Sequence, residues 1–154
     1  MNKKNFINEE VHKLYWKDNL NCATTIIKVL DKIFNFKPNS QVINSTIGLN
    51  GAGRYGAQCG LVEGVLISIG IIGKNNDLPN EFIINQCRNF AQKFEKKFGS
   101  LLCQKLRPQG FSKNIPPNLC EKITKKALLL SVEFIEDNIT KKYKCEKHGK
   151  RCAK

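Results

Sequence analysis

The sequence predicts an all-α protein, a single compact domain of about six or seven helices. Apolar residues recur at helical spacing along most of the chain, which is typical of helices that bury one face. A glycine-rich loop leads into an apolar segment, residues 57–72, long enough for a central buried helix. Residues 65–71 alternate in a way that would suit a strand, but no other segment offers a strand partner. The pattern therefore favours helices throughout.

The N-terminal quarter holds two predicted helices. Asn8 is the expected N-cap of the first, which runs to about Asp18. The second opens at residues 19–21 and carries one apolar stripe along its length. Cys22 lies in its first turn, and the helix ends before Pro38, because proline disfavours helical backbone in the residue before it.

A short third helix and the glycine-rich loop come next. Asn39 or Ser40 is the expected cap of the short helix, which reaches about Ile47. The loop, residues 48–56, then leads into the central helix. The sequence thus places a flexible, close-packing loop directly before the most apolar helix of the domain.

The C-terminal half holds a long helix, a short one and a last amphipathic one. An apolar stripe over residues 82–98 predicts the long helix, and Gly99 is a good residue to end it. Cys87 falls within this stripe, where a free cysteine is expected to be a small core hydrophobe. Cys103 lies on the short helix, and Cys120 lies in the first turn of the last one, after a proline-rich connection.

Length and composition indicate one domain with a basic tail. A chain of 154 residues with 41% hydrophobic residues can bury a core of its own without disulfides. No linker or internal repeat divides it, so residues 1–140 are expected to form the domain. Residues 141–154 are strongly basic and are expected to be a flexible tail. Cys145, His148 and Cys152 supply only three ligands among cationic neighbours, so we expect no specific metal site there.

The net charge of +13 bears on partners. Such a surplus attracts nucleic acid, acidic membranes or an acidic protein. The chain has no nucleic-acid-binding motif and no basic stripe interleaved with aromatic residues, and most lysines fall on helix faces expected to be solvated. Nucleic-acid binding is therefore not expected.

The predicted compartment is the cytoplasm. The first ten residues contain lysines but no apolar core of a signal peptide. The longest apolar stretch, residues 60–73, includes Glu63 and is too short to span a bilayer, so no membrane association is expected. Thiols stay reduced in the cytoplasm, so the seven cysteines point to metal binding or redox chemistry rather than to structural disulfides.

Four cysteines occupy related positions in the predicted fold. Cys22, Cys59 and Cys120 fall at or near helix starts, and Cys103 lies just before the connection that leads to Cys120. The N–H groups and positive end of the central helix are expected to favour the thiolate of Cys59. Convergence of these helix ends on one pocket would give four thiolates for zinc or for an iron–sulfur cluster. The sequence contains no Cys-x-x-Cys pair, so the spacing alone does not identify the metal.

The glycines beside Cys59 are candidate cofactor-binding residues. Gly51, Gly53, Gly56 and Gly60 would allow close helix packing and leave room for a group bound by the cysteines. Arg54 is the one charged side chain in the loop and could stabilise a thiolate or an anion. Glycine-rich loops also bind phosphates, but this one lacks the Gly-Lys-Ser/Thr ending of a phosphate loop.

The ordered motifs resemble a known family. Four motifs occur in order: Asn-Cys-Ala at 21–23, Cys-Gly-Leu-Val-Glu-Gly at 59–64, the segment 94–103 ending in cysteine, and Cys120 before an amphipathic helix. Together they are similar to the redox-active proteins named C_GCAxxG_C_C. The resemblance covers residues 6–139, and Leu61 stands where alanine is usual.

The resemblance implies a small all-helical domain with four signature cysteines, which are Cys22, Cys59, Cys103 and Cys120 here. It also implies a relationship to split-Soret cytochromes, in which the matching cysteines accompany an iron site of iron–sulfur type. The haem-attachment motif Cys-x-x-Cys-His is absent, so a cytochrome is not expected.

Three functions remain open from the sequence. The first is a cysteine-bound iron–sulfur cluster for electron transfer or redox sensing, with a redox protein as partner. The second is thiol–disulfide exchange, in which Cys59 attacks and one of the other three cysteines resolves the mixed disulfide. The third is a structural zinc site in an interaction module. Two copies could share cysteines across an interface, so a homodimer is also open.

Overall fold

The computed structural model of the chain describes residues 2–112, 114–115 and 117–141. Within these residues the fold is all-helical, with seven right-handed α-helices and no strand. A further four-residue turn, α4 (Gly51–Arg54), has helical hydrogen bonding but the opposite hand. The right-handed helices are α1 (Lys3–Trp16), α2 (Cys22–Phe34), α3 (Ser40–Ser45), α5 (Gly60–Asn75), α6 (Asn80–Phe98), α7 (Cys103–Leu106) and α8 (Glu121–Ile135).

Short helical turns extend some of these elements. A 3-10 turn, η1 (Thr46–Gly48), follows α3, and η2 (Pro117–Cys120) precedes α8. A π-helical turn, η3 (Glu136–Thr140), continues α8. No helix in the described part of the chain is long and apolar enough to cross a membrane.

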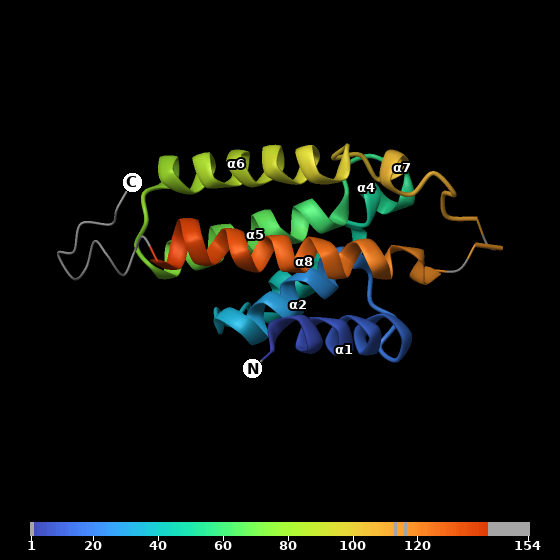
Figure 1. Cartoon of the computed structure of the whole chain (residues 1–154), viewed down its shortest axis with the longest axis horizontal. Coiled ribbons are helices and arrows are strands. Elements are labelled where there is room, and N and C mark those ends of the chain that lie inside the picture. Colours follow the sequence, from blue (N-terminus) through green and yellow to red (C-terminus); the bar gives the residue numbers. More distant parts are fainter. Residues whose placement is uncertain (1, 113, 116, 142–154) are drawn as a thin grey trace.

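The long helices pack in layers, with α5 and α8 in the middle. Figure 1 shows α6 on one side of α5 and α8, with α2 and then α1 on the other. Helices α2 and α5 make the closest pairing, because Gly64 has no side chain where they meet. A Cβ added at Gly64 would lie 2.8 Å from the carbonyl oxygen of Ala23 and 2.9 Å from Cβ of Ile26. The glycine therefore sets how closely the two helices approach.

The core is built from the apolar stripes that the sequence predicts. Phe90 and Phe94 of α6 are fully buried, and the Phe90 ring meets Phe134 of α8 edge to face at 5.4 Å between centroids. Edge-to-face aromatic pairs contribute beyond the apolar area they bury. Ile26 and Ile69 bring α2 and α5 into the same core.

Most predicted helices are confirmed, but two boundaries are wrong. The chain begins α1 at Lys3, with Asn2 as N-cap accepting from the backbone N–H groups of Lys4 and Asn5, whereas Asn8 lies inside the helix. The central helix begins at Gly60 rather than Ala57. Residues 56–59 instead form backbone hydrogen bonds to residues 101–104.

The remaining boundaries follow the cap residues. Asn21 and Asn39 cap α2 and α3 by accepting from Thr24 N and Val42 N. Gly99 ends α6 with a φ of 89°, a left-handed conformation that favours glycine. Apart from Lys141, the predicted C-terminal tail lies outside the described residues.

Candidate functional site

Four cysteines line one cavity at an end of the bundle. The cavity has a volume of about 320 Å³, and Cys22, Cys59, Cys103 and Cys120 all contribute to its wall. Figure 1 shows the α1–α2 connection, α4, α7 and the start of α8 at this end. In the part of the chain that the structure describes, no three Cys, His, Asp or Glu side chains are grouped closely enough to hold one metal ion. The thiols surround the cavity rather than meeting at one point.

Cys22 is placed by the capping residue that precedes it. The Asn21 side chain accepts from the backbone N–H of Thr24 and donates to the carbonyl oxygens of Thr46 and Ile47, both at 3.0 Å. It therefore caps α2 and ties the start of this helix to η1. Cys22, the first residue of α2, is fixed against the cavity as a result.

Gly60 brings the helix of Cys59 onto Cys22. A Cβ added at Gly60 would lie 2.6 Å from Sγ of Cys22 and 2.5 Å from the carbonyl oxygen of Leu49. Real Cβ atoms do not approach other atoms this closely, so only glycine fits here. The predicted role of Gly60 in close packing therefore has a specific neighbour, the sulfur of Cys22.

Backbone pairing aligns Cys59 with Cys103. The N–H of Cys59 donates to the carbonyl of Leu101 at 2.9 Å, and the N–H of Cys103 donates to the carbonyl of Ala57 at 2.7 Å. These bonds flank an isolated antiparallel bridge, and they anchor the chain on both sides of it. Two cysteines far apart in sequence are thereby held at the same edge of the cavity.

The turn α4 presses against Cys103. All four of its residues have positive φ: 71° at Gly51, 52° at Ala52, 65° at Gly53 and 70° at Arg54. Left-handed backbone costs roughly 1–2 kcal/mol for a residue with a side chain, so Ala52 and Arg54 are strained. A Cβ at Gly51 would lie 2.8 Å from Sγ of Cys103.

The other proposed loop residues differ in their surroundings. Gly56 packs against Cβ of Gln104, where an added Cβ would lie at 3.1 Å. A Cβ at Gly53 would meet nothing within 4 Å, so this glycine is required only by its backbone conformation. Arg54 is exposed and lines the cavity.

Cys120 is held by an anchor between α1 and α8. It is the N-cap residue of α8, and the next residue, Glu121, accepts hydrogen bonds from three side chains. These donors are Nδ1 of His12 at 3.0 Å, Nε1 of Trp16 at 2.8 Å and Nζ of Lys125 at 2.6 Å. Glu121 therefore fixes the start of α8, and with it Cys120, against α1.

The Glu121 anchor predicts acid-sensitive stability. Burial alone would raise the pKa of Glu121, but the hydrogen bonds from Lys125, Trp16 and His12 outweigh it and lower the pKa to about 2. A carboxylate with a lowered pKa contributes stability above its unfolded pKa and loses it as the pH falls toward its folded pKa. We expect Glu121→Gln to lower the free energy of unfolding by about 2 kcal/mol at pH 7. The difference from the parent protein should become smaller as the pH falls from about 4.5 to about 2.

Urea unfolding at pH 7 and at acid pH measures this cost. Glu133→Gln is the matched control, because Glu133 is an exposed glutamate on the same helix whose side chain forms no hydrogen bond or ion pair with the described residues. A Glu121→Gln variant as stable as Glu133→Gln at pH 7 would contradict the anchor.

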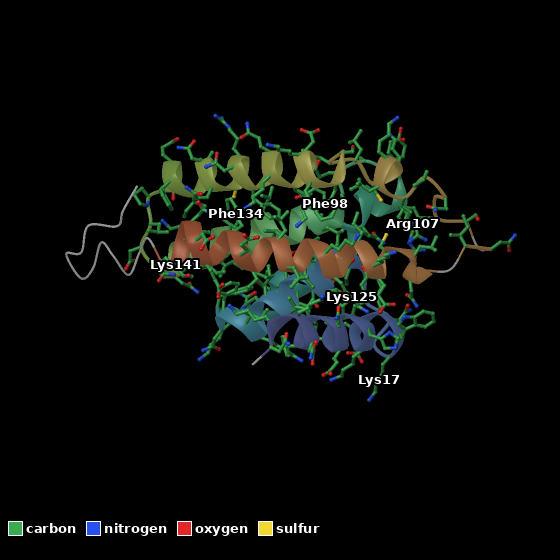
Figure 2. The ribbon with its side chains drawn as sticks, in the orientation of Figure 1. Lys17, Phe98, Arg107, Lys125, Phe134 and Lys141 are labelled. Atoms are coloured by element: carbon green, nitrogen blue, oxygen red, sulfur yellow. The ribbon has the colours of Figure 1, made fainter. Side chains whose placement is uncertain are left out.

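Arg107 is a site residue that sequence reasoning did not identify. Its side chain is only 4% exposed although it carries a permanent charge. Nη1 lies 3.6 Å from Sγ of Cys120, Nε donates to the carbonyl of Gly110 at 2.7 Å, and the guanidinium stacks on the Phe111 ring at 4.5 Å. Figure 2 shows Arg107 at the end of the bundle where α7 and the start of α8 lie. The only sequence signal was an arginine between two signature cysteines.

The charge of Arg107 acts on two of the thiols. Arg107 lies beside Cys120. Burial and the Cys120 sulfur raise the pKa of Cys103, and the charge of Arg107 offsets only part of this rise. Buried charges in proteins are normally paired. The wall of the cavity thus carries a fixed positive charge next to sulfur.

The expected thiolate at Cys59 is not what the structure favours. Burial raises the pKa of Cys59 to about 12, and hydrogen bonds from the backbone N–H groups of Leu61 and Val62 only partly offset it. Burial also raises the pKa of Cys22, with the neighbouring Cys59 sulfur adding to the effect. Cys59 is the N-cap residue of α5, but the influence of the helix N-terminus on its pKa is smaller than the cost of desolvating a thiolate.

The remaining cysteines lie elsewhere. Cys87 is half-buried on α6, with Sγ 4.0 Å from the carbonyl of Leu66, and it packs against the core away from the cavity, as predicted. Cys145, His148 and Cys152 lie outside the described residues. The cavity therefore takes its sulfur from the four signature positions.

Comparison with known proteins points to the same four cysteines. The family model described as "Putative redox-active protein (C_GCAxxG_C_C)" matches residues 20–134, a stretch that contains all four cavity cysteines. No curated protein and no solved structure gave a match. Because the match spans most of the chain, this protein belongs to the C_GCAxxG_C_C family.

Proposed function

We propose that this protein carries an iron–sulfur type cluster on Cys22, Cys59, Cys103 and Cys120 and uses it for electron transfer or redox sensing. The observation that carries the proposal is the convergence of four thiols, from four separate elements, on one cavity. Four cysteine thiolates are the usual ligand set of such clusters. The membership of a redox-active family supports the same chemistry.

The arrangement of the sulfurs favours a cluster over a single ion. A tetrahedral zinc site with Zn–S bonds of about 2.3 Å needs all its sulfurs close to one point. In a [4Fe–4S] cluster each cysteine binds a different iron, so the four ligands stand further apart around a larger group. Thiols that surround a cavity of about 320 Å³ suit the second arrangement better.

The cavity walls suit a buried, negatively charged group. Leu61, Leu106 and Ile123 make part of the cavity wall apolar. Arg107 supplies a buried positive charge beside Cys120 that would offset the charge of bound thiolates. A bound cluster would supply the one-electron chemistry, and the chain would hold it, screen it from water and set its potential.

The first test is the composition of the protein purified without oxygen. We expect iron and acid-labile sulfide, with visible absorption from sulfur-to-iron charge transfer. Stoichiometric zinc without colour would replace the proposal with a structural zinc site. Colourless, metal-free protein with a measurable dithiol potential would replace it with thiol–disulfide exchange through Cys59.

Single cysteine substitutions test the ligand assignment. We expect Cys22→Ser and Cys120→Ser to lose most of the bound iron, because a serine hydroxyl at these positions does not replace a thiolate ligand. Cys87→Ser is the matched control, because Cys87 lies away from the cavity. This variant should keep the iron that the protein binds. Iron and sulfide per chain, measured with circular dichroism to verify folding, give the result. Equal loss of iron from all three variants would contradict the four-ligand assignment.

A further inference from the structure

A second cavity adjoins the cysteine cavity, and its wall includes three cationic side chains. Its volume is about 230 Å³, and it shares Leu106, Arg107, Cys120 and Ile123 with the cysteine cavity. Lys122 and Lys126 of α8 complete the set of charged side chains in its wall. The space is several times the roughly 30 Å³ that one water molecule occupies in the liquid, so a ligand of several atoms fits.

The two lysines of this wall lie close together on α8. Lys122 and Lys126 are four residues apart on one face of α8, a spacing at which like charges repel. Neither lysine takes part in an ion pair within the described residues. The nearest carboxylate in sequence, Glu121, is held on the α1 side by three donors. The two lysines therefore bring positive charge to this cavity without an ion-pair partner among the residues that the structure describes.

We propose that this second cavity binds a small free oxyanion of the phosphate or sulfate type. Lys122 and Lys126 supply ammonium donors from α8, and the guanidinium of Arg107 forms the inner wall. Hydrogen bonds from charged donors to such an anion are short and strong. The occupant removes the repulsion between the two lysines, so binding also stabilises the start of α8.

The shared arginine links the two cavities, and this part rests on the proposed function. Arg107 contacts Cys120, and both residues line the oxyanion cavity as well as the cysteine cavity. An anion bound there offsets the positive charge that the cysteine site experiences. A more negative surrounding disfavours the reduced form of a cluster, so bound oxyanion lowers its reduction potential.

Calorimetric titration of the full chain with inorganic phosphate tests the site directly. We expect saturable binding that Lys122→Met with Lys126→Met weakens by about tenfold or more, since each lost charged contact is worth a factor of this order. Both lysines are exposed, so the double variant should fold. Lys93→Met with Lys97→Met is the matched control, with the same spacing and charge change on α6, outside both cavities.

The titration separates binding from general ionic effects. Sodium chloride at equal ionic strength should give no saturable heat. Absence of phosphate binding, or equal weakening by both double variants, would overturn the oxyanion site whatever cofactor the protein carries. If phosphate binds but leaves the potential of an iron-loaded protein unchanged, the link through Arg107 is wrong and the binding site stands.

Discussion

Gly60→Ala is expected to destabilise the protein and displace Cys22. The added methyl group would lie 2.5 Å from a backbone oxygen of Leu49 and 2.6 Å from Sγ of Cys22, and the backbone cannot move aside cheaply. Overpacking of this kind costs about 3 kcal/mol. Because the strain falls on a proposed ligand, we expect loss of bound iron as well as a lower midpoint in urea unfolding.

Gly70→Ala is the matched control for this effect. Gly70 lies in the same helix, α5, and a Cβ added there would meet nothing within 4 Å. Alanine is the better helix former, so this variant should be more stable than the parent by about 0.4–1 kcal/mol. Equal stability of the Gly60 and Gly70 variants would show that α5 does not rest on Cys22 as closely as described.

Arg107→Met is the second substitution with a large expected effect. It removes a buried charge, leaves the carbonyl of Gly110 without its Nε donor, and takes the guanidinium away from Cys120. Loss of a charged hydrogen bond in a buried setting costs about 2–3 kcal/mol. If the cysteines hold a cluster, removing a nearby positive charge should also make its reduction potential more negative.

The conservative variant separates charge from packing at this position. Arg107→Lys keeps the charge but not the guanidinium fork, so it should lose stability while holding the potential closer to that of the parent. Arg88→Met changes an exposed arginine of α6 and should alter neither quantity. Urea unfolding and a redox titration measure the two effects. Equal shifts of the potential in Arg107→Met and Arg107→Lys would exclude a role for the charge.

The helices, and the places of the cysteines relative to them, could be predicted from the sequence for clear physical reasons. Apolar stripes and cap residues such as Asn21 and Gly99 act locally, so the pattern places most helix ends correctly. The first cap was predicted at Asn8 but lies at Asn2, because asparagine is a good N-cap residue at either position and the pattern does not distinguish them. The position of Cys59 at the start of the central helix was also readable from its glycine-rich neighbours.

The rest of the site depends on contacts between distant segments. The burial of Arg107 follows from the path of the proline-rich connection, which no periodicity describes. The pairing of residues 56–59 with 101–104 uses backbone groups, which carry no sequence signature. The pKa of Cys59 depends on how deeply the thiol is buried, and this depth emerges only when α2, α7 and α8 close around it.

The distribution of the cavity cysteines along the chain has a consequence for how the protein matures. Cys22 is synthesised well before Cys120, which is the N-cap residue of α8. The pocket is therefore complete only after nearly the whole domain has been synthesised and has folded. A group that binds all four sulfurs would bind the native chain alone, so its binding energy adds to the free energy of unfolding. Cofactor binding would then be the last step in the maturation of the protein.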